Sequence, residues 1–217
     1  MTPDDYLKRL RLIVITDAQS TIPGDIEARV EQALMAGAPS IQLRDKDRGI
    51  RELLPLAQRI RALTRDFDAL FFVNDRLDLA LAAEADGVHL GPADLPVSAV
   101  RAVVPDRFLI GSSVDNPEAA RAAVAEGADY LGCGTVWATG SKQDAGRTVG
   151  VEGLRRVVAS VDVPVVAIGG INPERARLLP PTGAAGAAVI TAVMSAPDPS
   201  EAVRLLLDYL DPGLDLP

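Results

Sequence analysis

The sequence predicts one closed (β/α)8 TIM barrel, and three observations support this fold class. Short apolar runs alternate with longer amphipathic segments along all 217 residues, which is the pattern of parallel strands covered by helices. Eight such runs follow one another, and eight parallel strands close into a barrel of roughly 200–250 residues. Glycine and alanine recur just before several runs, where a helix ends and a strand begins. We therefore expect a single domain over residues 1–217.

The expected strands are runs rich in Val, Ile or Leu that are bounded by Gly, Pro or Asp, as buried parallel strands usually are. In chain order they are Leu12–Thr16, Ser40–Arg44, Leu70–Asn74, Gly87–Leu90, Phe108–Ser112, Tyr130–Gly132, Val165–Ile168 and Ala187–Ile190. Aromatic residues make up only 4% of the chain, so aliphatic side chains must fill the interior.

Amphipathic segments between these strands predict helices at Asp25–Ala36, Ile50–Thr64 and Pro117–Glu126. Helix ends recur as Ala85-Asp86-Gly87 and Gly127-Ala128-Asp129, each next to the start of a strand. A doubly wound open sheet is the alternative architecture. That fold often has a glycine-rich first turn, and the turn after the first expected strand contains no glycine.

The charge balance limits the classes of partner. The net charge is −8 and the sequence pI about 4.7, and no basic patch is present, so nucleic acid is not an expected partner. An acidic protein that binds anionic substrates has to gather its basic residues locally or use a metal ion.

Cysteine and hydropathy bear on the compartment. Cys133 is the single cysteine, which excludes an internal disulfide and suits a reducing cytoplasm. The first residues lack the apolar core of a secretory signal. The longest uncharged run, Leu178–Pro197, contains Pro180 and Pro181 and cannot form one spanning helix. We expect a cytoplasmic protein without a membrane partner.

The carboxyl ends of barrel strands line the active site, so the residues there are the candidates for chemistry. After the second expected strand, Gln42 and Arg44 fall on one face by strand alternation, and Lys46 follows. An arginine, a lysine and an amide at one rim suit a diphosphate group. The alternative is surface charge, with Arg44 and Lys46 paired to Asp45 and Asp47.

Two aspartates follow neighbouring strands. Asn74 and Asp75 end the third expected strand, and Asp94 follows the fourth. Magnesium prefers one or two carboxylates together with water and phosphate oxygens, so both aspartates are candidate Mg²⁺ ligands. Asp75 is equally a good helix N-cap, and Asp94 a turn or cap residue.

Hydroxyl groups and glycines follow the remaining strands. Such groups hold phosphate oxygens through O–H and backbone N–H donors, and barrels often bind phosphate after the last two strands. The candidates are Ser113, Thr139, Ser141, Lys142, Gly170, Ile190 and Thr191. The alternative is that Ser113 and Ser141 are ordinary loop residues. The segment 137–150 is the longest stretch without a predicted element, which is typical of a functional loop.

Three further side chains could have a functional or a structural role. His89 is the single histidine, and a structural role near its strand end is the simpler reading. Cys133 could be a nucleophile, but the chain has no histidine besides His89 to activate it, so we expect a small buried residue. Trp137 either stacks on a substrate ring or covers the core. No Cys and His cluster indicates zinc.

Taken together, these motifs resemble the thiamine-phosphate synthase family. The resemblance runs from about Thr16 to Thr191, and its motifs occur in order at successive strand ends. They are Gln42-Leu43-Arg44-Asp45-Lys46, Asn74-Asp75-Arg76, Asp86-Gly87-Val88-His89-Leu90-Gly91, Asp94, Gly127-Ala128-Asp129-Tyr130, Thr139-Gly140-Ser141-Lys142 and Ala167-Ile168-Gly169-Gly170-Ile171.

The resemblance implies a transferase that joins a pyrimidine-methyl diphosphate to a thiazole phosphate, giving thiamine phosphate and pyrophosphate. It implies that the diphosphate leaves before the thiazole nitrogen attacks. The residues implied for the pyrimidine diphosphate are Gln42, Arg44, Lys46, Asn74, Ser113 and Lys142, with Arg44, Lys46 and Lys142 assisting its departure. Those implied for the thiazole phosphate are Thr139, Ser141, Gly170, Ile190 and Thr191, and those for Mg²⁺ are Asp75 and Asp94.

The chain departs from the family pattern at a few positions. Thr135 and Ala138 stand where the family usually has proline, while Ser141 and Thr191 keep a hydroxyl group. Val114-Asp115 replaces a segment that often carries histidine. These changes affect loop stiffness and leave the charged set intact.

Other functions remain open from the sequence. TenI-like thiazole tautomerases share the fold but typically lose part of the diphosphate and metal set, and they use a histidine near the position of Thr135. A non-catalytic binder of thiazole phosphate and a phosphate-binding isomerase of amino-acid biosynthesis are further alternatives. The oligomeric state is not specified either, with a homodimer as one option.

Overall fold

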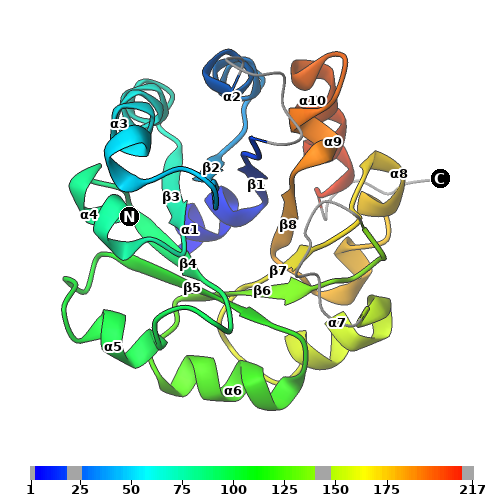
Figure 1. The fold of residues 1–217 in the computed structure, drawn as a ribbon. Helices are drawn as coiled ribbons and strands as arrows, with labels where there is room; N and C mark the ends of the chain where they lie inside the picture. Colours follow the sequence, from blue (N-terminus) through cyan, green and yellow to red (C-terminus); the bar gives the residue numbers. More distant parts are fainter. Residues whose placement is uncertain (1–2, 19–25, 140–147, 212–217) are drawn as a thin grey trace.

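The computed structural model describes residues 3–18, 26–139 and 148–211, and it confirms the predicted fold class. Eight parallel strands pair in chain order from β1 to β8, and β8 pairs back to β1 through Val14 and Val189. Helices surround this ring (Figure 1). The strands are β1 Leu12–Ile15, β2 Ser40–Leu43, β3 Leu70–Asn74, β4 Gly87–Leu90, β5 Leu109–Val114, β6 Tyr130–Gly134, β7 Val165–Ile168 and β8 Gly186–Val189.

The expected strand positions are confirmed, with shifted ends. β5 and β6 each continue two residues further than expected, to Val114 and Gly134. Serine and glycine at these positions carry a weak strand signal, but the added residues still pair in register, as Val114 does with Cys133. This extension carries Ser113 up to the rim of the barrel.

The described helices are α1 Pro3–Leu10, α2 Ile26–Met35, α3 Ile50–Asp66, α4 Leu77–Ala82, α5 Val97–Arg101, α6 Pro117–Ala125, α7 Gly150–Val158, α8 Pro173–Ala176, α9 Thr191–Met194 and α10 Pro199–Tyr209, with a 3-10 turn at Pro180–Thr182. Local sequence explains where several of them begin. The Asn116 side chain accepts hydrogen bonds from the backbone N–H groups of Glu118 and Ala119, and Pro117 occupies the first helical position. None of the described helices is both long and apolar enough to cross a bilayer.

Two separate cores hold the barrel together. The larger one, the outer core, lies between the strands and the helices and includes Ile41, Phe71 and Leu131, none of which is exposed. The smaller one, the inner core, fills the inside of the ring, where the Phe72 and Tyr130 rings lie with centroids 5.3 Å apart. Its members are Leu10, Ile13, Ile15, Leu70, Phe72, Tyr130, Val166, Ala188 and Ile190.

Helix α1 was not predicted. Its residues Tyr6 and Leu10 pack against the inner core, and the Arg9 carbonyl accepts a hydrogen bond from the Ser40 hydroxyl at 2.6 Å. Figure 1 shows α1 behind the centre of the ring. The helix therefore covers the amino ends of the strands, and this placement leaves the carboxyl ends as the open side.

Aspartates at the starts of β4 and β6 tie neighbouring elements together. Asp86 accepts two hydrogen bonds from Arg61 of α3, at 2.7 and 3.0 Å, and one from the Phe71 backbone N–H at 2.8 Å. Asp129 likewise accepts a hydrogen bond from the Arg101 side chain and one from the backbone N–H of Ile110. The recurring Ala-Asp motif is therefore structural, as expected for the amino-terminal face of a barrel.

We predict that Asp86→Asn lowers the free energy of unfolding by about 2 kcal/mol, because a bidentate bond between charged groups is lost in a partly buried setting. Urea denaturation measures this change. The matched control is Glu84→Gln, which removes the exposed ion pair with Arg65 and should cost less than about 0.5 kcal/mol. Equal losses in the two variants would contradict the structural role of Asp86.

Cys133 belongs to the outer core and is fully buried. Burial, with a smaller effect from the charge of Asp115, raises the pKa of the Cys133 thiol to about 12. The thiolate is the reactive form, so we predict that iodoacetamide at pH 8 leaves the folded protein unmodified and labels it in urea. Rapid labelling of the folded protein, followed by mass spectrometry, would show that the thiol is accessible after all.

Candidate active site

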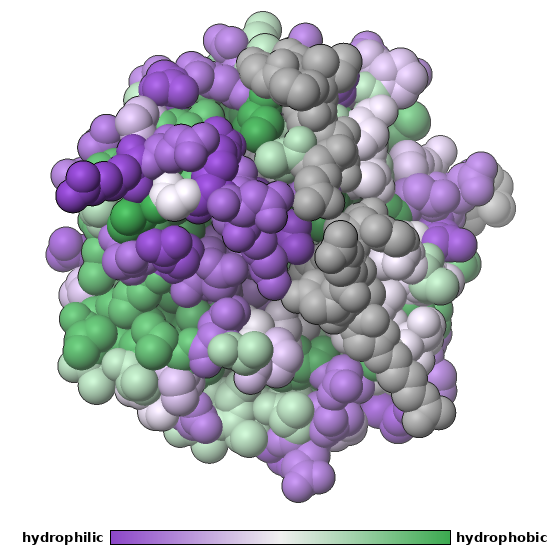
Figure 2. All heavy atoms as spheres, viewed as in Figure 1, coloured by the Kyte–Doolittle hydropathy of each residue, from purple (hydrophilic) through white to green (hydrophobic). Residues whose placement is uncertain are grey.

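A cavity of about 570 Å³ opens at the carboxyl ends of the strands. Figure 2 shows hydrophilic residues across the middle of this face, over the loop that follows β2. The predicted site residues that line the cavity are Arg44, Lys46, Asn74, Asp94, Ser113, Thr139, Gly170, Ile190 and Thr191. They come from seven different strand ends or loops, and closure of the barrel brings them together.

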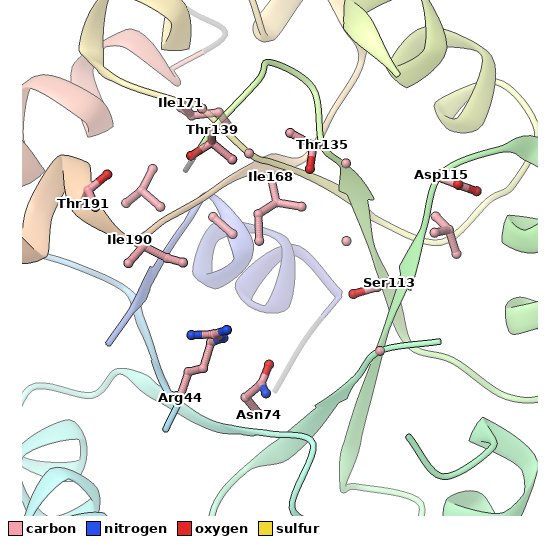
Figure 3. A pocket seen from close by; sticks show the side chains of 18 of the residues that line it. Arg44, Asn74, Ser113, Asp115, Thr135, Thr139, Ile168, Ile171, Ile190 and Thr191 are labelled. Carbon is pink, nitrogen blue, oxygen red and sulfur yellow. The ribbon is translucent and has the colours of Figure 1, made fainter. Parts of the chain in front are cut away.

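The cavity has two chemically different sides. Figure 3 shows Arg44, Asn74 and Ser113 on one side and the three isoleucines Ile168, Ile171 and Ile190 on the other, with Thr139 and Thr191 next to the isoleucines. The first side is charged and polar. The second is lined by isoleucines and hydroxyl groups, with the Arg175 guanidinium bonded to the Gly170 carbonyl nearby. The cavity can therefore hold an anion at the first side and a ring at the second.

Arg44 is held from two directions. Its guanidinium lies 3.4 Å from the carboxylate of Asp17, and both side chains are about one-tenth exposed. Its backbone N–H donates to the Thr16 hydroxyl at 3.0 Å. Asp17 follows β1, two residues after its last residue, and was missed in the sequence because its partner is 27 residues away. The pair orients the Arg44 guanidinium beside the cavity.

Asp45 organises the loop that carries Lys46. Its carboxylate accepts hydrogen bonds from the backbone N–H groups of Asp47 and Arg48 and from the Arg48 side chain at 2.8 Å. Burial alone would raise the pKa of Asp45, but these bonds and the Arg48 charge outweigh it and hold the pKa below its ordinary value. Asp45 therefore stabilises the loop. The surface-charge alternative paired Arg44 with Asp45 or Asp47, whereas in the structure Arg44 pairs with Asp17.

Asp75 and Asp94 lie close enough for their charges to interact. Burial, and next the negative charge of Asp94, raise the pKa of Asp75, while the charge of Lys46 opposes the rise. Asp75 adopts a left-handed backbone with φ of 53°, and its backbone N–H donates to the His89 carbonyl at 2.9 Å. Asp94 accepts the Gly91 N–H at 2.6 Å. Two carboxylates are thus kept near each other at an electrostatic cost that a cation would relieve.

This pair fits magnesium better than a metal held wholly by protein. Among the described residues, no group of three or more His, Cys, Asp or Glu side chains gathers as a metal cage. Magnesium needs hard oxygen donors and typically takes only one or two carboxylates, with water and substrate oxygens completing its shell. Asp75 itself does not line the cavity, whereas Asp94 does.

His89 connects the inner core to the polar side of the cavity. Its Nδ1 lies 3.1 Å from the Tyr130 hydroxyl and its Nε2 lies 2.9 Å from the Ser113 hydroxyl. A Cβ on Gly111 or Gly132 would come within 3.0 Å of the His89 ring, so glycine at both positions makes room for it. His89 therefore has the structural role predicted for it, and it fixes Ser113 at the rim.

The glycines after β7 touch the loop after β6. Gly169 and Gly170 have φ of 102° and 64°, and a Cβ on Gly170 would lie 2.7 Å from the Trp137 carbonyl oxygen. Trp137 packs against the outer core, which favours the covering role over stacking on a substrate ring. The glycine pair is required by this close approach as well as by any bound anion.

Three of the predicted residues are not among those that line the cavity in the described part of the chain. Gln42 is 2% exposed and does not line the cavity; it lies on the inner face of β2, in register with Ile15 and Phe72. Ser141 and Lys142 lie outside the residues that the structure describes. Their proposed contacts therefore stay predictions.

Several cavity residues were not found from the sequence. Asp115, Asn172 and Arg175 line the cavity without having been candidates. Asp115 and Asn172 stand in loops beside helix starts, where capping accounts for such residues. Arg175 lies within a helical turn, and nothing in the local pattern separates it from a surface arginine.

Comparisons with known proteins agree with this geometry. The family model described as thiamine monophosphate synthase matches residues 12–193. A thiamine-phosphate synthase of Pyrococcus furiosus is 48% identical over 198 residues, covering 91% of this chain and 93% of the relative. One of Moorella thermoacetica is 50% identical over 181 residues, covering 83% and 86%.

A solved structure extends the agreement to three dimensions. The thiamine phosphate pyrophosphorylase of Pyrococcus furiosus superposes with a TM-score of 0.87 at 45% sequence identity, covering 94% of this chain and 97% of that one. The matched segment contains every described site residue discussed above. The chain therefore belongs to the thiamine monophosphate synthase family.

Proposed function

We propose that the chain is a transferase of thiamine biosynthesis that joins a pyrimidine-methyl diphosphate to a thiazole phosphate and releases pyrophosphate. The observation that carries this proposal is the division of one cavity into a side with Arg44, Asn74 and Ser113 and a side with isoleucines and hydroxyl groups. Relatives named thiamine-phosphate synthase, about half identical to this chain over most of its length, support the same reaction.

The charged side is suited to the diphosphate. Arg44 can offer paired N–H donors to phosphate oxygens, and Lys46 adds a point positive charge. Asn74 and Ser113 would complete the set for the pyrimidine diphosphate, together with Gln42 below and with Lys142 from the neighbouring loop. As the bond to the diphosphate breaks, Arg44, Lys46 and Lys142 would stabilise the negative charge that develops on it.

Asp75 and Asp94 would hold Mg²⁺ on the same side. Their mutual repulsion, together with the hard oxygen donors that they provide, fits this ion. When bound, magnesium would neutralise charge on the departing pyrophosphate.

The opposite side would receive the thiazole phosphate. Thr139, Thr191 and Ser141 would supply hydroxyl donors, and Gly170 and Ile190 backbone groups. The isoleucine side chains would exclude water from the pyrimidine cation that forms when the diphosphate leaves, so that the thiazole nitrogen, rather than water, captures it. This chemistry needs no general base, in keeping with a cavity whose nearby histidine is occupied by Tyr130 and Ser113.

The proposal also includes the partners and the cellular location of the protein. Small phosphorylated molecules are the expected partners, without nucleic acid or membrane, and the whole barrel acts as one catalytic domain. We place the protein in the cytoplasm, in keeping with its single cysteine. A homodimer remains one option for the assembly.

We predict that Asp75→Asn and Asp94→Asn each lower pyrophosphate release by about 100-fold or more, because each removes half of the charge that binds magnesium. The assay contains both substrates and is run with magnesium and with excess EDTA. EDTA should abolish wild-type turnover as well. The matched control is Asp78→Asn, since Asp78 of α4 is exposed and paired with Arg76, and it should keep wild-type activity.

Full turnover in EDTA would contradict the metal assignment. The tautomerase alternative is separated in the same experiment by offering the thiazole carboxylate phosphate alone. Isomerisation without pyrimidine diphosphate and without magnesium would favour that alternative over the synthase.

We further predict that His89→Ala lowers kcat/KM for the pyrimidine diphosphate about tenfold, because the Ser113 hydroxyl loses the bond that orients it. His89→Gln, which can still donate to Ser113, should recover part of the loss. Tyr130→Phe removes the more distant bond and should cost less. Thermal unfolding checks that all three variants fold. An unchanged KM and kcat in His89→Ala would show that Ser113 needs no support.

A further inference from the structure

Arg175 is a cation on the cavity wall that the proposed function leaves unassigned. It lies in α8 and lines the cavity beside Gly170, Ile171 and Asn172. One guanidinium nitrogen donates to the Gly170 carbonyl at 2.6 Å, and the guanidinium carbon lies 5.6 Å from the centre of the Trp137 ring. The backbone N–H of Arg175 is also bonded to the Asn172 side chain at 2.9 Å. The guanidinium is therefore held in place before any substrate binds.

The charge of Arg175 is not neutralised by a carboxylate within the part of the chain that the structure describes. Its bonds there go to a carbonyl oxygen and an aromatic ring, both of which are neutral. Arg44, by contrast, pairs with Asp17. A guanidinium has five N–H donors, and the bond to Gly170 uses one of them.

The thiazole side of the cavity needs such a charge. A phosphate monoester carries about −1.5 to −2 charges near neutral pH. The residues proposed to hold it are hydroxyls and backbone groups, which are neutral, and the whole chain has a net charge of −8. Arg44 is drawn on the other side of the cavity from Thr139 and Thr191 (Figure 3), while Arg175 adjoins Gly170.

We propose that Arg175 determines specificity for a phosphorylated thiazole, by placing a fixed positive charge beside Gly170 where the phosphate group binds. The bond to Gly170 and the stacking on Trp137 position the guanidinium, and its remaining donors meet phosphate oxygens. The thiazole alcohol, which lacks the phosphate, gains nothing from this charge. This inference rests on the proposed function of the site.

The test is calorimetric binding of thiazole phosphate and of the thiazole alcohol to the full-length protein, without magnesium or pyrimidine diphosphate. We expect Arg175→Gln to weaken thiazole phosphate binding roughly 10- to 100-fold, because a charge-assisted bond is lost, and to change alcohol binding less than about twofold. Arg175→Lys should recover part of the preference, since it keeps the charge without the planar fork. The matched control is Arg177→Gln, because Arg177 is exposed and stacks on Tyr209 at 4.7 Å.

Three results would overturn the inference. Equal weakening of phosphate and alcohol binding would show that Arg175 only supports the Gly170 loop. Unchanged binding of thiazole phosphate by Arg175→Gln would show that the charge does not contribute. If the wild-type protein bound no thiazole phosphate, Arg175 would have no phosphate group to contact. Tight wild-type binding of thiazole phosphate without pyrophosphate release, once all substrates are added, would instead count against the proposed function and leave the role of Arg175 standing.

Discussion

Closure of eight parallel strands is the constraint on which the rest of this structure depends. Because every strand runs in the same direction, all the carboxyl ends meet at one rim, and residues from separate loops become neighbours there. Large side chains such as Phe72 and Tyr130 fill the ring nearer its amino ends, and α1 covers that side. Near the carboxyl ends the inward-facing residues are small, among them Gly132 and Gly134, and the space that they do not fill is the cavity.

The cavity also reconciles an acidic protein with anionic substrates. The net charge of −8 is spread over the whole molecule, whereas the cations face one cavity from two sides. Each of these groups is held by neighbours: Arg44 by Asp17, the Lys46 loop by Asp45, and Arg175 by Gly170 and Trp137. Fixed charges need little rearrangement when a substrate binds, which is how a site stabilises developing charge efficiently.

The sequence predicted the fold well because its signals are repeated. Eight apolar runs, each followed by a helical segment, determine the barrel, and the expected strands lie within about two residues of the observed ones. Helix α1 was missed, because its apolar residues are buried only by packing against the inside of the ring, a contact that the local sequence pattern does not show. The ends of β5 and β6 were missed because serine and glycine carry no strand signal.

The site could be predicted in part, for a similar reason. Residues at strand ends, such as Asn74 and Asp94, follow directly from the barrel rule and line the cavity. Asp17 and Arg175 could not be found this way, since their importance comes from contacts across the chain. Gln42 followed the alternation rule but is buried one layer below the cavity, because alternation gives the face of a residue and not its depth.

The most direct test of the account is a crystal structure of the protein grown with magnesium and pyrophosphate. We expect pyrophosphate in contact with Arg44 and Lys46, and an ion that is bound by Asp75 and Asp94. Pyrophosphate bound at the Gly170 side, or an ion bound away from both aspartates, would contradict it.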